Sequence, residues 1–162
     1  MTKTAHPKTT ATMVLAALAA GLLALIVTYT PASARTVGDA KPPRVIEVRP
    51  AAGAIGVSPL DRCCPSEGHR VVAFFSEDMK PGSAMRSIEL YKKGSDTLED
   101  GTMGYNAAQR KVTFWPPNPL ERGVTYKAVV STRAKDLAGN RLDQNRNRAG
   151  LQPKVWYFTI EE

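Results

Sequence analysis

The sequence predicts an all-β fold, with one antiparallel β-sandwich of about seven strands after residue 43. Short runs rich in Val, Ile, Phe, Tyr and Thr alternate there with Gly, Pro, Asn and Asp, which is typical of strands joined by turns. No stretch of ten or more residues in this region keeps a helical apolar period, so helices are not expected to build the core. The predicted strands are 44–49, 70–76, 87–92, 101–105, 111–115, 124–132 and 154–160.

Alternation within these runs predicts which side chains face the core, because successive strand residues point to opposite faces. The predicted inward residues of the earlier strands are Val71, Ala73, Phe75, Ile88, Leu90, Val112, Phe114, Tyr126, Ala128 and Val130. The last strand is apolar on both faces. Its inward set is either Trp156, Phe158 and Ile160, or the alternate set with Val155 and Tyr157.

Two loops and one corner are also predicted. Residues 106–110 lie between two strand candidates and form a hairpin loop. Residues 116–119 contain three prolines, which lack N–H donors, so this segment must cross one end of the sandwich. Tyr126 follows Gly123 near the start of a strand and resembles a tyrosine corner, in which the hydroxyl bonds to nearby backbone. We therefore expect Tyr126 to be structural.

The first 34 residues have the order of an export signal. Lys3 and Lys8 precede an apolar run from Met13 to Val27, and small residues follow up to Ala34. The apolar run has 15 residues, whereas a membrane-spanning helix needs about 20. We therefore expect a cleaved signal peptide over 1–34, with an uncleaved signal anchor as the alternative. A linker over 35–43 and a single domain over 44–162 would follow, in a secreted or cell-envelope protein.

The net charge of +7 is uneven along the chain. Residues 101–160 contain ten basic and three acidic residues. Such an excess fits a partner with negative charge, namely an anionic envelope polymer, a lipid surface or a nucleic acid. The charges are scattered, with no block of like charge, which favours a solvated basic face. Export argues against nucleic acid, and membrane contact is expected only through residues 13–27 if they remain uncleaved.

Six short motifs occur in a recognisable order after residue 43. They are PAAGAIGV at 50–57, FSEDM at 75–79, YNAAQRKVTFWP at 105–116, LERGVTY at 120–126, KDLAGN at 135–140 and WYFT at 156–159. This series resembles the bacterial Ig-like domain family of S-layer and other cell-envelope proteins, specifically the SbsA type. Asp78 stands where the family usually has proline.

The resemblance implies an immunoglobulin-like sandwich that binds or spaces in the cell envelope and presents loops for adhesion, assembly or ligand capture. It implies neither catalysis nor a cofactor, and it leaves the ligand and the oligomeric state open. Possible partners are envelope proteins or anionic surface polymers. The positions that match its motifs, and to which a structural role is assigned, are Gly123, Tyr126, Asp136, Gly139, Asn140, Trp156 and Phe158.

The segment 58–69 is longer than the corresponding link of the family and carries Cys63, Cys64 and His69. Adjacent Cα atoms lie about 3.8 Å apart, so a bond between the two cysteines would be strained. A vicinal disulfide, an intermolecular disulfide and free thiols are the alternatives. Metal binding by these three residues is a weaker candidate, because adjacent residues rarely point at one metal. The alternative function is therefore a metal-handling or thiol-redox envelope protein.

Other site chemistry is weaker. Asp136, Asn140 and the alternating run 143–147 are rich in oxygen ligands for Ca²⁺. A calcium loop needs glycine and glutamate where Arg148 and Lys154 stand, so ordinary turns are favoured. His69 is the one histidine after residue 34, and no phosphate loop, zinc-protease helix or nucleophile elbow occurs. The sequence therefore predicts no enzyme.

Overall fold

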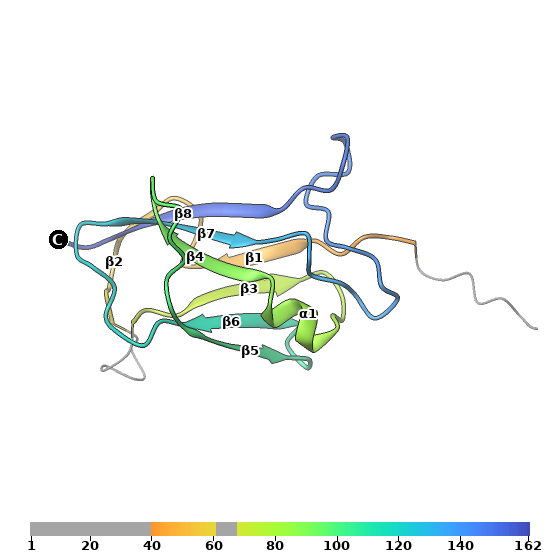
Figure 1. Cartoon of the computed structure of the whole chain (residues 1–162), viewed down its shortest axis with the longest axis horizontal. Helices are drawn as coiled ribbons and strands as arrows, with labels where there is room; N and C mark the ends of the chain where they lie inside the picture. Colours follow the sequence, from red (N-terminus) through yellow and green to blue (C-terminus); the bar gives the residue numbers. More distant parts are fainter. Residues whose placement is uncertain (1–39, 61–67) are drawn as a thin grey trace, which may run out of the picture. The chain divides into compact units, whose positions relative to one another are not determined.

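The computed structural model describes residues 40–60 and 68–162, which form two four-stranded sheets packed as a sandwich (Figure 1). The all-β, Ig-like prediction is confirmed. In chain order the elements are β1 (Val45–Arg49), β2 (Ala54–Val57), β3 (Val71–Phe75), α1 (Pro81–Met85), β4 (Ile88–Lys92), β5 (Thr102–Asn106), β6 (Lys111–Trp115), β7 (Thr125–Val130) and β8 (Lys154–Ile160). The first sheet has the order β1-β3-β6-β5, and the second has the order β2-β8-β7-β4.

Each of the seven predicted strands is present, and every predicted bound agrees with the observed one to within two residues. The sequence analysis missed β2, which pairs parallel to β8 and makes the second sheet mixed where an antiparallel one was predicted. β2 has four residues, includes Gly56, and leaves Ile55 81% exposed, so it shows no buried alternation. The helix α1 was not predicted either, because five residues are too few to show a helical period.

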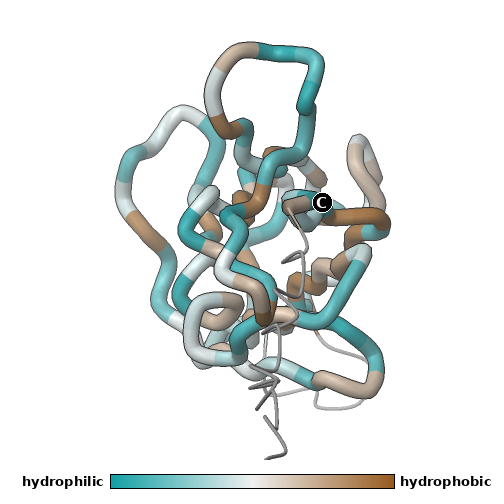
Figure 2. Tube along the Cα trace, turned by 90° about the vertical axis from the view of Figure 1, so that its right-hand side faces the viewer, coloured by the Kyte–Doolittle hydropathy of each residue, from teal (hydrophilic) through white to brown (hydrophobic). Residues whose placement is uncertain are grey.

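The core lies between the sheets and is built by the predicted inward residues, which are all buried. In β8 the inward set is Trp156, Phe158 and Ile160, each at most 2% exposed, whereas Val155 and Tyr157 are more than 40% exposed. Each large apolar side chain buried in this way contributes about 1.5–3 kcal/mol. Figure 2 shows that much of the surrounding loop chain is hydrophilic.

The loops gather at the two ends of the sandwich. The hairpin between β5 and β6 turns through Arg110, which has a positive φ of 49°. The prolines at 116–119 connect β6 to β7 across one end. The opposite end carries α1 and the segment 131–141 (Figure 1). Met79, just before α1, forms an isolated bridge with Asp136 of that segment.

The predicted signal sequence, with its run Met13 to Val27, lies outside the described residues, as do most of the predicted linker and the pair Cys63 and Cys64. Within residues 40–60 and 68–162, no helix is long and apolar enough to cross a membrane.

Candidate functional site

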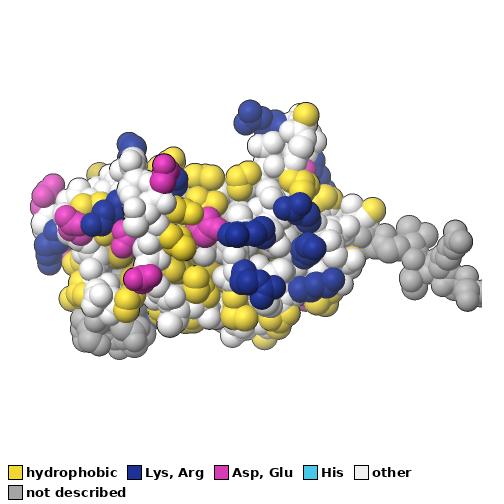
Figure 3. Space-filling view, viewed as in Figure 1, with side chains coloured by type: hydrophobic (Ala, Val, Ile, Leu, Met, Phe, Trp, Pro, Cys, Tyr) yellow, Lys and Arg dark blue, Asp and Glu magenta, His cyan; other side chains and the backbone are white. Residues whose placement is uncertain are grey.

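A basic cleft lies at the end of the sandwich between α1 and the segment after β7. Its volume is about 740 Å³. The lining residues are Lys80, Pro81, Gly82, Ser83, Arg86, Arg133, Lys135 and Arg141. Five of these eight carry positive charge, and all five are exposed. Figure 3 shows Lys and Arg side chains gathered over this end of the molecule.

The first wall of the cleft is α1 and its flanks. Pro81 occupies the first helical turn, where its missing N–H is not needed and its fixed φ suits a helix. The N–H groups of Ser83 and Ala84 donate to the Lys80 carbonyl at 2.9 and 3.1 Å. Ala84 is fully buried, while Lys80 and Arg86 on either side of it are exposed. The short helix thus holds two cations at the rim.

The second wall is a loop fixed by the buried carboxylate of Asp136, which is 1% exposed. This carboxylate accepts hydrogen bonds from the N–H of Gly139 at 2.6 Å, and from the N–H and Nδ2 of Asn140 at 2.8 and 2.7 Å. Gly139 has a φ of 99°, a conformation that favours glycine. The fixed loop presents Arg133, Lys135 and Arg141.

The two walls are hydrogen-bonded to each other. The N–H of Lys80 donates to the Lys135 carbonyl at 2.8 Å. The Ser83 hydroxyl accepts from the N–H of Lys135 at 3.0 Å and donates to the Lys80 carbonyl at 2.9 Å. Because these bonds link backbone to backbone and to one short side chain, the width of the cleft is set by the fold.

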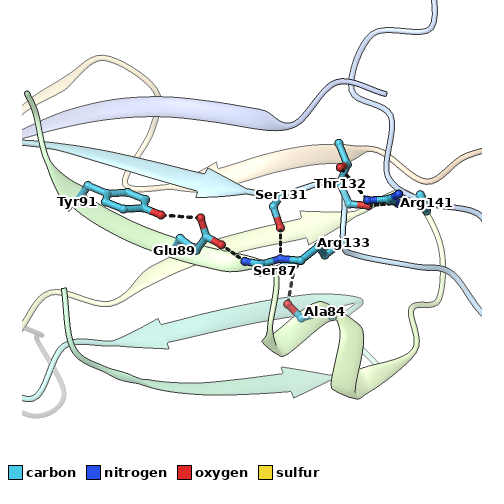
Figure 4. Close-up of polar contacts among 8 residues, drawn as sticks. All are labelled: Ala84, Ser87, Glu89, Tyr91, Ser131, Thr132, Arg133 and Arg141. Carbon is cyan, nitrogen blue, oxygen red and sulfur yellow. Dashed lines mark hydrogen bonds and ion pairs between the residues drawn. The ribbon is translucent and has the colours of Figure 1, made fainter. Parts of the chain in front are cut away.

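The five cations fall into two groups. Arg133 is held by an ion pair with Glu89 and by Ser131, whose Oγ accepts from its Nε at 3.2 Å (Figure 4). Arg141 donates from Nε to the Thr132 carbonyl at 2.9 Å. The structure shows no ion pair for the remaining three, Lys80, Arg86 and Lys135, with any residue in 40–60 or 68–162.

This arrangement suits anion binding. Guanidinium and ammonium groups donate charge-assisted hydrogen bonds to phosphate, sulfate or carboxylate oxygens. The single hydroxyl that lines the cleft, on Ser83, is engaged with backbone groups on both walls. The other charged residues of the lining are lysines and arginines, and no histidine, cysteine or carboxylate is among them. The cleft thus presents donors of positive charge to an anion.

Several residues assigned a structural role in the sequence lie away from the cleft. The Tyr126 hydroxyl accepts a hydrogen bond from the backbone N–H of Glu121 at 3.0 Å, and its ring stacks on Phe158 with centroids 5.8 Å apart. Burial raises the pKa of Tyr126 above its ordinary value of 10.0. Gly123 has a φ of 71°, and Trp156 is 2% exposed with its Nε1 unpartnered among the described residues.

The side chains considered as calcium ligands accept hydrogen bonds from backbone N–H groups. The Asp143 Oδ1 accepts from the N–H groups of Asn145 and Gln152 at 3.1 and 3.2 Å, as expected of turn residues. The backbone N–H of His69 donates to the Pro59 carbonyl at 3.1 Å. The imidazole Nδ1 of His69 is buried without a hydrogen-bond partner in the described chain. In that same part of the chain, no group of three or more His, Cys, Asp or Glu side chains could hold a metal ion.

A second hollow, of about 630 Å³, is lined by Gly101, Thr102, Trp115, Pro116 and Pro117. None of these residues carries a charge or a titratable group. The N–H of Gly68 donates to the carbonyl of Pro116, one of these lining residues, at 3.2 Å. The basic cleft is therefore the better defined site.

The positive charge of 101–160 is visible in the sequence, but the cleft is not. Lys80 and Arg86 lie outside that segment and about 50 residues before the other three cations. The register of β4 on β7, with Ile88 opposite Val130, brings the two segments together. That register was the missing information.

The sequence profile of the bacterial Ig-like domain family matches residues 39–160. A search of curated proteins returned no match. Among solved structures, the S-layer protein rSbsC(31-844) is similar at 18% identity and a TM-score of 0.48, over 75% of this chain and 14% of that one. CopC from Methylosinus trichosporium OB3b is similar at 15% identity and a TM-score of 0.49, over 74% of this chain and 93% of that one.

An L,D-transpeptidase from Mycobacterium smegmatis is similar at 20% identity and a TM-score of 0.44, over 75% of this chain and 41% of that one. The chain thus spans about one seventh of the length of the S-layer protein it resembles. The profile match covers most of the sequence, and the two-sheet sandwich agrees with it. The protein belongs to the bacterial Ig-like domain family.

Proposed function

We propose that the protein is an exported, non-catalytic Ig-like module of the bacterial cell envelope that binds an anionic polymer through the basic cleft. The observation that carries this proposal is the gathering of Lys80, Arg86 and Lys135 in one cleft without acidic partners in the described chain. Like charges held close together repel, and an anionic ligand relieves that repulsion.

The placement in the envelope is supported by the signal-like order of residues 1–34 and by the similarity of the six motifs to SbsA-type domains. Membership of the bacterial Ig-like family fits a binding or spacing role. The lining of the cleft supports binding without catalysis, because its one hydroxyl is hydrogen-bonded to backbone groups and its charged residues are all cations.

The proposal is tested by measuring the affinity of the purified protein for two polyanions, inorganic polyphosphate and polygalacturonate, at low salt and at about 0.5 M salt. Binding at low salt that weakens steeply with added salt is the expected result. The double variant Lys80→Gln/Lys135→Gln removes two charges that have no ion pair in the described chain, and it should weaken binding of both polymers about tenfold at low salt.

The matched control is Arg49→Gln/Arg122→Gln. It removes two exposed charges that lie outside the cleft and pair with Glu47 and Glu161. This control should change the affinity less than twofold at low salt. Equal loss in both double variants would mean that net charge, and not the cleft, governs binding. If neither polymer binds at low salt, the proposed function is refuted.

A further inference from the structure

The outer face of the second sheet continues from the basic cleft without a break. Glu89 of β4 pairs with Arg133 at the rim of the cleft through one carboxylate oxygen. Its other carboxylate oxygen accepts a hydrogen bond from the Tyr91 hydroxyl at 2.8 Å. Figure 4 shows Arg133, Glu89 and Tyr91 lying in sequence along this face. The cleft and the sheet surface are thus joined side chain to side chain.

Tyr91 begins a row that crosses three strands. It lies opposite Lys127 of β7, which lies opposite Tyr157 of β8. The neighbouring row of Leu90, Ala128 and Trp156 is buried in the core, and side chains alternate along each strand, so the tyrosine row faces outward. Tyr157 is 42% exposed.

Cations accompany both rings. The Lys127 Nζ lies 4.5 Å from the centroid of the Tyr91 ring, and the Lys93 Nζ lies 6.0 Å from that of Tyr157. Strands in a sheet are about 4.8 Å apart, so the backbones of Tyr91 and Tyr157 are separated by roughly 9.6 Å. The row therefore presents two tyrosine rings on the outer face, each with an ammonium group over one face of the ring.

We propose that the basic cleft and the row Tyr91–Lys127–Tyr157 form one binding face for an anionic polysaccharide. Aromatic rings pack against the apolar faces of sugar rings, while ammonium and guanidinium groups bind carboxylate, sulfate or phosphate substituents. A polymer that carries both features matches both halves of the face. Glu89, the acidic group at the junction, is neutralised by its ion pair with Arg133 and therefore does not repel the polymer.

This inference rests on the proposed function and adds the chemical class of the polymer. The experiment compares four probes with the purified protein at low salt. Polygalacturonate carries rings and charge, polyphosphate carries charge alone, dextran carries rings alone, and single-stranded DNA is the competing polyanion with stacking bases. We expect polygalacturonate to bind more tightly than polyphosphate of equal charge, and dextran not to bind.

The deciding variant is Tyr157→Ala, whose side chain is exposed and outside the core. It should weaken polygalacturonate binding about fivefold to tenfold and leave polyphosphate binding within about twofold. Ile46→Ala is the matched control, because Ile46 is an exposed apolar residue of β1 in the other sheet. This control should leave both affinities unchanged.

Four results would overturn the inference. Equal affinity for polygalacturonate and polyphosphate, with no effect of Tyr157→Ala on either, would exclude the tyrosine row from the binding face. That result would not contradict the proposed function. Tighter binding of single-stranded DNA than of polygalacturonate would assign the face to a different polymer. Dextran binding as tight as that of polygalacturonate would remove the requirement for charge. Absence of binding to both polygalacturonate and polyphosphate would refute the proposed function itself.

Discussion

The hydroxyl oxygen of Tyr126 lies 3.0 Å from the backbone nitrogen of Glu121 and accepts its hydrogen bond. The link ties the start of β7 to the end of the proline-containing connection from β6. Because Tyr126 is 1% exposed, its ring belongs to the core while its hydroxyl organises a loop at the surface. One residue thereby joins sheet packing to loop conformation.

Replacing Tyr126 by phenylalanine should lower the free energy of unfolding by about 1 kcal/mol, since the substitution removes one hydrogen bond and keeps the ring stacked on Phe158. Urea unfolding followed by tryptophan fluorescence measures the change. Tyr157→Phe, on the exposed outer face, is the control and should be neutral within about 0.5 kcal/mol. An unchanged urea midpoint for Tyr126→Phe would contradict the structural role assigned to the hydroxyl.

The same residue predicts how stability depends on alkaline pH. Burial raises the pKa of folded Tyr126 above 10.0, so the unfolded chain loses this proton first as pH rises. The unfolded state then binds fewer protons than the folded state, and stability falls as pH increases through the unfolded pKa toward the folded one. The stability gap between wild type and Tyr126→Phe should therefore narrow between pH values of about 8.5 and 10.5. A constant gap across that range would contradict the prediction.

Asp136→Asn should destabilise the protein by about 2–4 kcal/mol. The buried carboxylate accepts three hydrogen bonds from Gly139 and Asn140. In the asparagine variant an NH2 group replaces one carboxylate oxygen, and this group cannot accept a hydrogen bond from the donors that face it. The measurement is thermal or urea unfolding. Asp78→Asn is the control, because it disrupts an exposed ion pair with Arg110 and should cost less than about 1 kcal/mol. Equal effects of the two substitutions would argue against the anchoring role of Asp136.

Glu89→Gln should strengthen binding of polyphosphate about twofold to fivefold at low salt, because it releases Arg133 from its acidic partner and adds one positive charge to the rim of the cleft. Glu47→Gln, which frees Arg49 on the other sheet, is the matched control and should have a smaller effect. The gain should disappear at high salt, where surface charges are screened. Weaker binding by Glu89→Gln would mean that the ion pair is needed to position Arg133.

Most of the strand pattern could be predicted from the sequence, because alternating apolar residues report burial directly. In β7, Tyr126, Ala128 and Val130 are buried as their spacing indicates. In β8, apolar residues occupy both faces, and the pattern alone could not show that Val155 and Tyr157 face solvent. Burial by neighbouring strands decides that choice, and it is a property of the assembled sandwich.

The candidate site was less accessible to sequence reasoning. A cleft made by Lys80 and Arg86 together with Arg133, Lys135 and Arg141 depends on strand register and on a short helix, neither of which leaves a local pattern. Tyr91 and Tyr157 likewise become neighbours in a row only through their shared partner Lys127. The prediction for Cys63 and Cys64 concerns residues that the structure does not describe, and it stays a prediction.

The hydrogen bonds that join Lys80 and Ser83 to Lys135 have a thermodynamic consequence. A cleft whose walls are already bonded to each other has little backbone entropy left to lose when a ligand arrives. Long cationic side chains and the counterions around them are then the parts whose freedom changes. Binding of the proposed polyanion at this end of the sandwich would therefore be driven mainly by the release of small counterions, and the backbone would contribute little entropy cost.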